Sequence, residues 1–271
     1  MSLIAVIIAA VIAVVGLVFA GLHVRPRALA PFPPVPGSRF DYQPVPAGLP
    51  APVARYYQAI MGDRVPVVRS AVLTGRGYLR LGGLRFPAAV RFTHDAGQGY
   101  RHYLAGHIFG RRLFQANEWY LDGRCRMELP VGVIENDAKT DAGAALGLWA
   151  ESALLPSVFL TDPRVRWEPI DELHARLVVP SGDGTDTFTA TFDPETGLLR
   201  SLEALRWKQP TSPAKLRWLA EVRDYRPVGG VLLPATLAAT WEDEQSPWLH
   251  ITMDEIVYNV DVTEYIRATG P

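Results

Sequence analysis

The chain has 271 residues, of which 48% are hydrophobic and 20% charged, and its formal net charge is −1. This composition excludes a largely disordered chain, and the near-neutral balance gives no support for nucleic-acid binding, which usually shows a strongly basic domain. The single cysteine, Cys125, excludes an internal disulfide framework and any metal site built from several cysteines.

The N-terminal segment is the most apolar part of the chain. Residues 3–22 carry no charge and are long enough to cross a bilayer as one helix of ~20 residues. A cleaved signal peptide is the alternative, since Val18-Phe19-Ala20 resembles a cleavage site, but no Lys or Arg precedes the run. We therefore predict a single-pass transmembrane anchor over residues 1–23, with the lipid bilayer as its partner. Arg25 and Arg27 follow the span, and two charges leave the side of the C-terminal domain open.

Eight prolines lie within residues 24–50. They favour extended polyproline conformation and predict a semi-rigid linker between the anchor and the domain. The alternative is a strap along the domain surface, held by Phe32, Phe40 and Tyr42.

Residues 51–271 are predicted to form one antiparallel β domain, which begins with a short helix at about 52–61. Apolar and polar residues then alternate with a period of two, as in residues 86–93 and 187–192, and turn residues recur at fairly even intervals. This pattern predicts about ten to twelve strands joined by short turns.

One segment, at about 139–155, has helical spacing instead. Its apolar residues share one helix face, and Pro156 ends the segment; these residues are Leu146, Trp149, Ala150, Ala153 and Leu154. Because an amphipathic helix needs a packing partner, we predict a mainly β (α+β) fold. It is a curled antiparallel sheet or open barrel with one central amphipathic helix against its concave face.

Charge divides unevenly along the domain. Residues 51–130 have a net charge of +7, and residues 131–271 have a net charge of −10. The basic half could face anionic lipid headgroups. We favour the alternative, in which its arginines pair with acids of the other half, each exposed pair adding little stability.

Side chains that could carry chemistry form no recognisable motif. His102 and His107 are five residues apart, on opposite faces of a regular strand, so they cannot share a metal. Neither a nucleophile elbow nor a phosphate loop is present. Glu151 lies off the apolar helix face and is interpreted as a solvated residue or an arginine partner, rather than a carboxylate at a cavity rim. We expect no catalytic residue, no metal and no cofactor.

Aromatic residues are spread over the predicted strands and helix. Core packing is one interpretation. The other is an apolar cavity between sheet and helix, of the kind that β-barrels use for small ligands. Its candidate ligand-binding residues are Trp119, Leu146, Trp149, Phe159 and Trp167.

Several segments together resemble a bacterial family of uncharacterised, often membrane-anchored proteins over about residues 48–260. These segments are residues 48–57, 148–157, 164–170, 192–197 and 256–259. The resemblance implies no activity and no catalytic residues. Residues 193–197 and 225–234 are also similar, at the level of fold, to periplasmic lipoprotein carriers. That likeness implies an open antiparallel barrel whose helices line an apolar ligand site.

These features predict a membrane-tethered, non-enzymatic domain that binds a lipid or another apolar small molecule. A structural or interaction module for a membrane-protein partner is the first alternative. A hydrolase with an unrecognised site is the second, and it requires His94, His102, His107 or Glu151 to cluster in a cleft.

Overall fold

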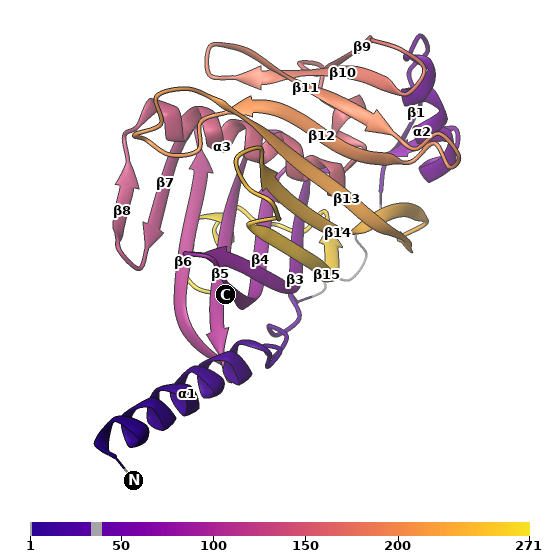
Figure 1. Cartoon of the computed structure of the whole chain (residues 1–271). Coiled ribbons are helices and arrows are strands. Elements are labelled where there is room, and N and C mark those ends of the chain that lie inside the picture. The colour runs from indigo at the N-terminus through magenta and orange to yellow at the C-terminus, as the bar shows by residue number, and fades with distance from the viewer. Residues whose placement is uncertain (1, 34–39) are drawn as a thin grey trace.

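The computed structural model describes residues 2–33 and 40–271 (Figure 1). Its helical elements are α1 (Leu3–Leu22), α2 (Ala51–Met61), α3 (Ala138–Glu151), η1 (Ser152–Leu154), α4 (Val158–Thr161) and η2 (Tyr265–Arg267). Its strands are β1 (Tyr42–Pro44), β2 (Arg64–Pro66), β3 (Ser70–Leu81), β4 (Leu84–Asp95), β5 (Gly99–Ile108), β6 (Arg111–Leu121), β7 (Arg124–Leu129), β8 (Gly132–Glu135), β9 (Arg166–Pro169), β10 (His174–Ser181), β11 (Gly184–Phe192), β12 (Leu199–Arg206), β13 (Leu216–Val228), β14 (Val231–Trp241) and β15 (Leu249–Tyr258).

Within the described residues, thirteen strands form one antiparallel sheet in the order β8-β7-β6-β5-β4-β3-β15-β14-β13-β12-β11-β10-β9, and β1 pairs separately with β2. Each strand pairs with its chain neighbour, except where β3 pairs with β15 and joins the two halves of the sheet. The sheet curls around α3 without closing, as Figure 1 shows. The predicted curled antiparallel sheet is confirmed. The strands outnumber the prediction because four of them span only three or four residues, too few to show an alternating pattern.

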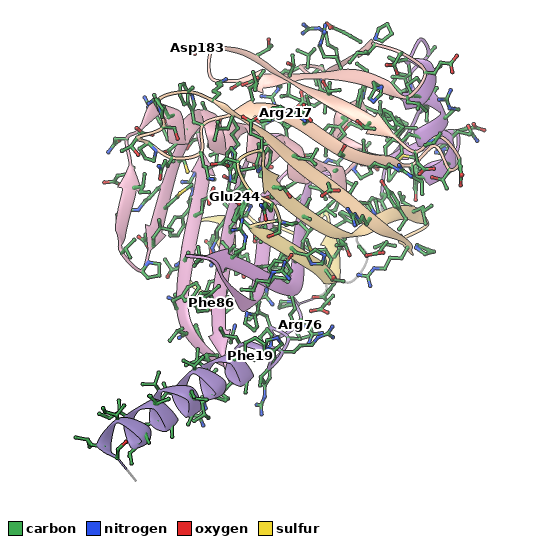
Figure 2. All side chains as sticks on the ribbon, in the orientation of Figure 1. Phe19, Arg76, Phe86, Asp183, Arg217 and Glu244 are labelled. Carbon is green, nitrogen blue, oxygen red and sulfur yellow. The ribbon has the colours of Figure 1, made fainter. Side chains whose placement is uncertain are left out.

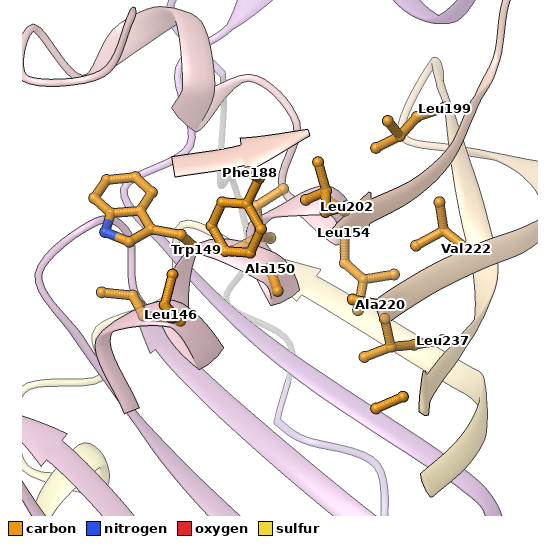
Figure 3. Close-up of a cluster of buried hydrophobic side chains, with 14 of the residues drawn as sticks. Leu146, Trp149, Ala150, Leu154, Phe188, Leu199, Leu202, Ala220, Val222 and Leu237 are labelled. Atoms are coloured by element: carbon orange, nitrogen blue, oxygen red, sulfur yellow. The ribbon is translucent and has the colours of Figure 1, made fainter. Parts of the chain in front are cut away.

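The central helix α3 fills the concave side of the sheet. It contacts β6 and β7 in one half and β10 and β12 in the other, so ten of its residues are buried. Figure 3 shows Leu146, Trp149 and Ala150 beside Phe188, with Leu154 of η1 close by. Asp137 caps the helix start, its Oδ1 accepting from the Thr140 amide at 2.7 Å. Each large apolar side chain buried here contributes roughly 1.5–3 kcal/mol.

The convex side of the sheet is covered around β4 and β5 by two chain segments. Phe32, from the proline-rich region, packs against Tyr265 with ring centroids 5.0 Å apart. The Arg101 guanidinium lies 4.9 Å from the Tyr265 ring centre, and Arg91 donates to the Ala30 carbonyl. These strands are therefore buried on both faces, and Ala30 and Phe32 of the proline-rich region contact this side of the domain.

Candidate functional site

The five predicted ligand-binding residues do not all come together. Leu146, Trp149 and Phe159 belong to one packed core and are 1–2% exposed. Trp167 packs against this core, its ring centroid 5.9 Å from that of Phe159. Trp119 pairs with Arg101 on the convex side of the sheet, separate from the other four. Their role in binding a ligand stays a prediction.

Two hollows in the described part of the domain differ in place from the expected cavity beneath the central helix. One of about 330 Å³ is lined by residues of mixed charge, including Arg69, Asp95 and Asp122, beside the β4–β5 turn. The other, of about 10 Å³, is an apolar crevice between Phe40 and Leu155, roughly the space of one water molecule. Neither lies beneath α3, where side chains form the core of Figure 3.

Three buried side chains that could carry chemistry converge at the end of α3. The Nε2 atoms of His94 on β4 and His102 on β5 lie 3.1 Å and 2.7 Å from the same Glu151 oxygen, Oε2. Their exposures are 0%, 6% and 9% for His94, His102 and Glu151. Glu151 is therefore neither solvated nor an arginine partner, which corrects that interpretation.

The β4–β5 hairpin positions the two histidines. His94 pairs with Tyr100 and Phe92 pairs with His102, so the histidines are diagonal neighbours on one face of adjacent strands. The His102 ring packs between Phe92, with centroids 4.2 Å apart, and Tyr100, with centroids 4.0 Å apart and planes at 12°. The Tyr100 hydroxyl donates to the Glu118 carboxylate, and this hydrogen bond holds the Tyr100 ring in place.

The electrostatics of the cluster favour charge on both partners. Burial opposes ionisation of Glu151, but the charge and hydrogen bond of His102, with a further contribution from His94, lower its pKa to about 2. Burial likewise opposes protonation of His102, but Glu151 outweighs it and raises the His102 pKa. The carboxylate and imidazole thus stabilise each other's charged forms in a dry environment.

The convergence of His94 with His102 has a signal in the sequence. His94 continues the alternation of Phe86, Ala88, Val90 and Phe92, and a turn at 95–97 folds β5 back beside it. Extending the alternation by one residue would have placed both histidines on the same face. His107 lies elsewhere, with its Nδ1 3.0 Å from the Ala105 carbonyl. Glu151 has no such signal because its approach depends on how α3 packs.

A different feature stands at the end of the domain nearest α1. We define the hairpin tips as residues 81–85 and 108–113, the β3–β4 and β5–β6 turns with their flanks. The Phe109 amide donates to the Gly21 carbonyl at 2.8 Å, and a Cβ on Gly21 would lie 2.7 Å from side-chain carbons of Ile108 and Phe109. The last turn of α1 is therefore seated directly on the β5–β6 turn (Figure 1).

The hairpin tips combine exposed apolar and basic side chains. Four apolar residues are 48–56% exposed, namely Leu81, Leu84, Phe109 and Leu113. Arg85, Arg111 and Arg112 are also exposed, and none of them forms an ion pair within the described residues. The tips contain no acidic residue. Figure 2 shows Phe86 at this end of the domain and Asp183 at the opposite end.

Helix α1 itself is long and apolar enough to cross a membrane. It has 20 residues, its mean hydropathy reaches 3.2, and none of the residues in its most apolar window is buried. A signal sequence meets the same criteria. Helix α1 is therefore a candidate membrane-spanning helix.

Comparison with known proteins identifies a family and finds solved structures with partial similarity. The family described as "Family of unknown function (DUF6544)" matches residues 39–252, and no curated protein matches. A LolA superfamily protein from Nitrosomonas europaea has 11% identity and a TM-score of 0.46, covering 81% of this chain and 94% of that one. A DUF1329 family protein from Desulfovibrio piger has 13% identity and a TM-score of 0.45, covering 82% and 96%. Likeness at this level says nothing of a ligand.

Proposed function

This chain belongs to a family of unknown function, DUF6544, and we propose that it is a membrane-tethered domain that binds lipid with its hairpin tips. The observation that carries the proposal is the seating of α1 on the β5–β6 turn. If α1 spans a bilayer, its last residue, Leu22, lies at the membrane surface. The hairpin tips then meet the same surface.

The side chains of the tips suit such a surface. Leu81, Leu84, Phe109 and Leu113 can enter the headgroup region, where apolar side chains are removed from water. The arginines of the tips form no ion pair within the described residues and can meet anionic headgroups, each contributing ~1 kcal/mol. The proposal places the lipid outside the domain because α3 and its neighbours fill the interior, and it requires no catalytic step.

Fluorescence quenching in nanodiscs tests this arrangement on the full chain. Leu113→Cys carries a fluorophore at a hairpin tip, and Asp183→Cys carries the same fluorophore at the far end of the domain. Cys125 is 2% exposed and its thiol pKa is raised by burial, so it remains unlabelled in the native protein. Lipids with a headgroup-level quencher are expected to quench the label at 113 strongly and the label at 183 not at all.

The charge requirement is tested separately. Replacing Arg111 and Arg112 by Gln is expected to weaken quenching at position 113 in anionic nanodiscs and to leave it unchanged in zwitterionic ones. Equal quenching at positions 113 and 183, or none at either, would overturn the proposal. If the environment of the label at position 113 changes only when a membrane-protein partner is added, that result would instead favour the interaction-module alternative.

A further inference from the structure

Two imidazole nitrogens and one carboxylate oxygen meet within the domain, at a place that the lipid proposal does not use. The Nε2 atoms of His94 and His102 and the Oε2 atom of Glu151 all lie within 4.8 Å of one another. We propose that these three side chains form a binding site for a divalent transition-metal ion of the Zn²⁺ type.

The donor set fits such an ion. Two histidines and one carboxylate bind Zn²⁺ in several zinc sites, and imidazole also suits other first-row divalent ions. Ligand atoms that each lie about 2.0–2.2 Å from a tetrahedral metal are roughly 3.4 Å apart. The Glu151 oxygen is 3.1 Å from His94 and 2.7 Å from His102, so a withdrawal of the carboxylate by less than 1 Å would make room.

A divalent cation would provide a partner for all three side chains of this cluster, which a single proton does not. A proton on His102 bridges His102 and Glu151, but it leaves His94 fully buried with neither ring nitrogen hydrogen-bonded in the described part of the chain. Buried polar groups without partners are rare in native proteins. A divalent ion would accept the Nε2 lone pairs of both histidines and the charge of the carboxylate together.

The surrounding residues hold the ligands ready. Phe92 and Tyr100 fix the plane of the His102 ring from both sides, and paired strands β4 and β5 fix the spacing of the two histidines. Such support reduces the reorganisation needed on binding. The side chains of His102 and Glu151 remain 7% and 11% exposed, so the cluster is not completely sealed from solvent. Three protein ligands leave one tetrahedral position for water.

Metal titration of the purified full chain in detergent tests the proposal. We expect one Zn²⁺ per chain by calorimetry and elemental analysis, and a Co²⁺ complex with the intense visible absorption of tetrahedral cobalt. Glu151→Gln and His94→Gln should each lower Zn²⁺ affinity by more than about 100-fold. A residue that only orients a metal ligand, without binding the metal, lowers affinity by at most about 100-fold when it is replaced. His174→Gln is the matched control, since His174 pairs with Asp171 at 2.8 Å on the surface.

A measurement without substitutions covers the case in which a variant fails to fold. X-ray absorption of the wild-type chain loaded with one equivalent of Zn²⁺ should show two imidazole ligands and oxygen ligands at metal-bond distance. Absence of stoichiometric binding, a spectrum without two imidazoles, or affinity lost in His174→Gln and retained in Glu151→Gln would overturn the proposal.

Discussion

Trp149 gives the sharpest test of whether the concave side of the sheet is a packed core or a ligand site. Its side chain is 2% exposed, and its indole N–H donates to the Pro180 carbonyl at 3.0 Å. It also reaches the β4–β5 turn, where a Cβ on Gly97 would lie 3.3 Å from Cη2. One residue thus connects α3 to both halves of the curled sheet.

Replacing Trp149 by Ala should remove a large part of the stability of the domain. Truncation of a buried Trp costs about 3–5 kcal/mol, and the Pro180 carbonyl left without its donor adds roughly 1–3 kcal/mol. A loss of at least ~4 kcal/mol corresponds to a fall in Tm of roughly 8–16 °C for a domain of this size. Trp149→Phe fills most of the space and should lose clearly less.

Thermal unfolding of the full chain in detergent, followed by the circular dichroism of the sheet, measures these losses. Trp207→Ala is the control, because Trp207 is only half-buried, beside Lys139. Equal losses for Trp149→Ala and Trp207→Ala would refute the packed-core reasoning. A Trp149→Ala chain that unfolds like the wild type would likewise contradict the packed-core reasoning.

Two further changes test the close packing and electrostatics of the sheet. Gly77→Ala would place a Cβ 1.7 Å from the His250 carbonyl oxygen, so we expect it to separate β3 from β15. The free energy of unfolding, measured by chemical denaturation, should fall by about 3 kcal/mol or more. Gly184→Ala is the control and should be nearly neutral, because its Cβ would meet nothing nearer than 3.9 Å. Burial lowers the pKa of His107 and outweighs the hydrogen bond that its Nδ1–H donates to the Ala105 carbonyl. The folded state therefore binds a proton at His107 less readily than the unfolded state does. Neutral His107 contributes to the free energy of unfolding above its ordinary pKa of about 6.5, and this contribution is lost as the pH falls below that value. His107→Gln should be less sensitive than the wild type between pH 7 and pH 5 in the same assay, and an unchanged slope would contradict the assignment.

Local sequence patterns were sufficient for the architecture of the domain. The alternation at residues 86–93 predicts β4, and the helical spacing of Leu146, Trp149 and Ala150 predicts α3, because each pattern reflects which face is buried. Helix α3 ends at Glu151 and continues as a tighter turn to Leu154. The pattern did not show that α3 is buried almost all round, since that depends on the curling of both sheet halves over it.

The candidate sites were less predictable because they combine distant segments. The position of His94 beside His102 follows from one hairpin, whereas the approach of Glu151 requires the docking of α3 on β5. Burial of Arg91 on the convex side depends on contacts with Ala30 and Tyr265, from opposite ends of the chain. No periodicity within β4 carries that information, and an arginine there reads as solvent-facing.

The two proposed sites occupy the same pair of strands but should act independently. His102 is six residues from Ile108 along β5, which is roughly 20 Å at ~3.3 Å per residue. Effects of substitutions this far apart usually add without interaction. Glu151→Gln should therefore leave lipid quenching at position 113 unchanged, and replacement of Arg111 and Arg112 should leave Zn²⁺ affinity unchanged. Loss of both lipid quenching and Zn²⁺ affinity in either variant would point to a folding defect. Loss of only one of them in each variant would assign lipid binding and metal binding to opposite ends of β4 and β5.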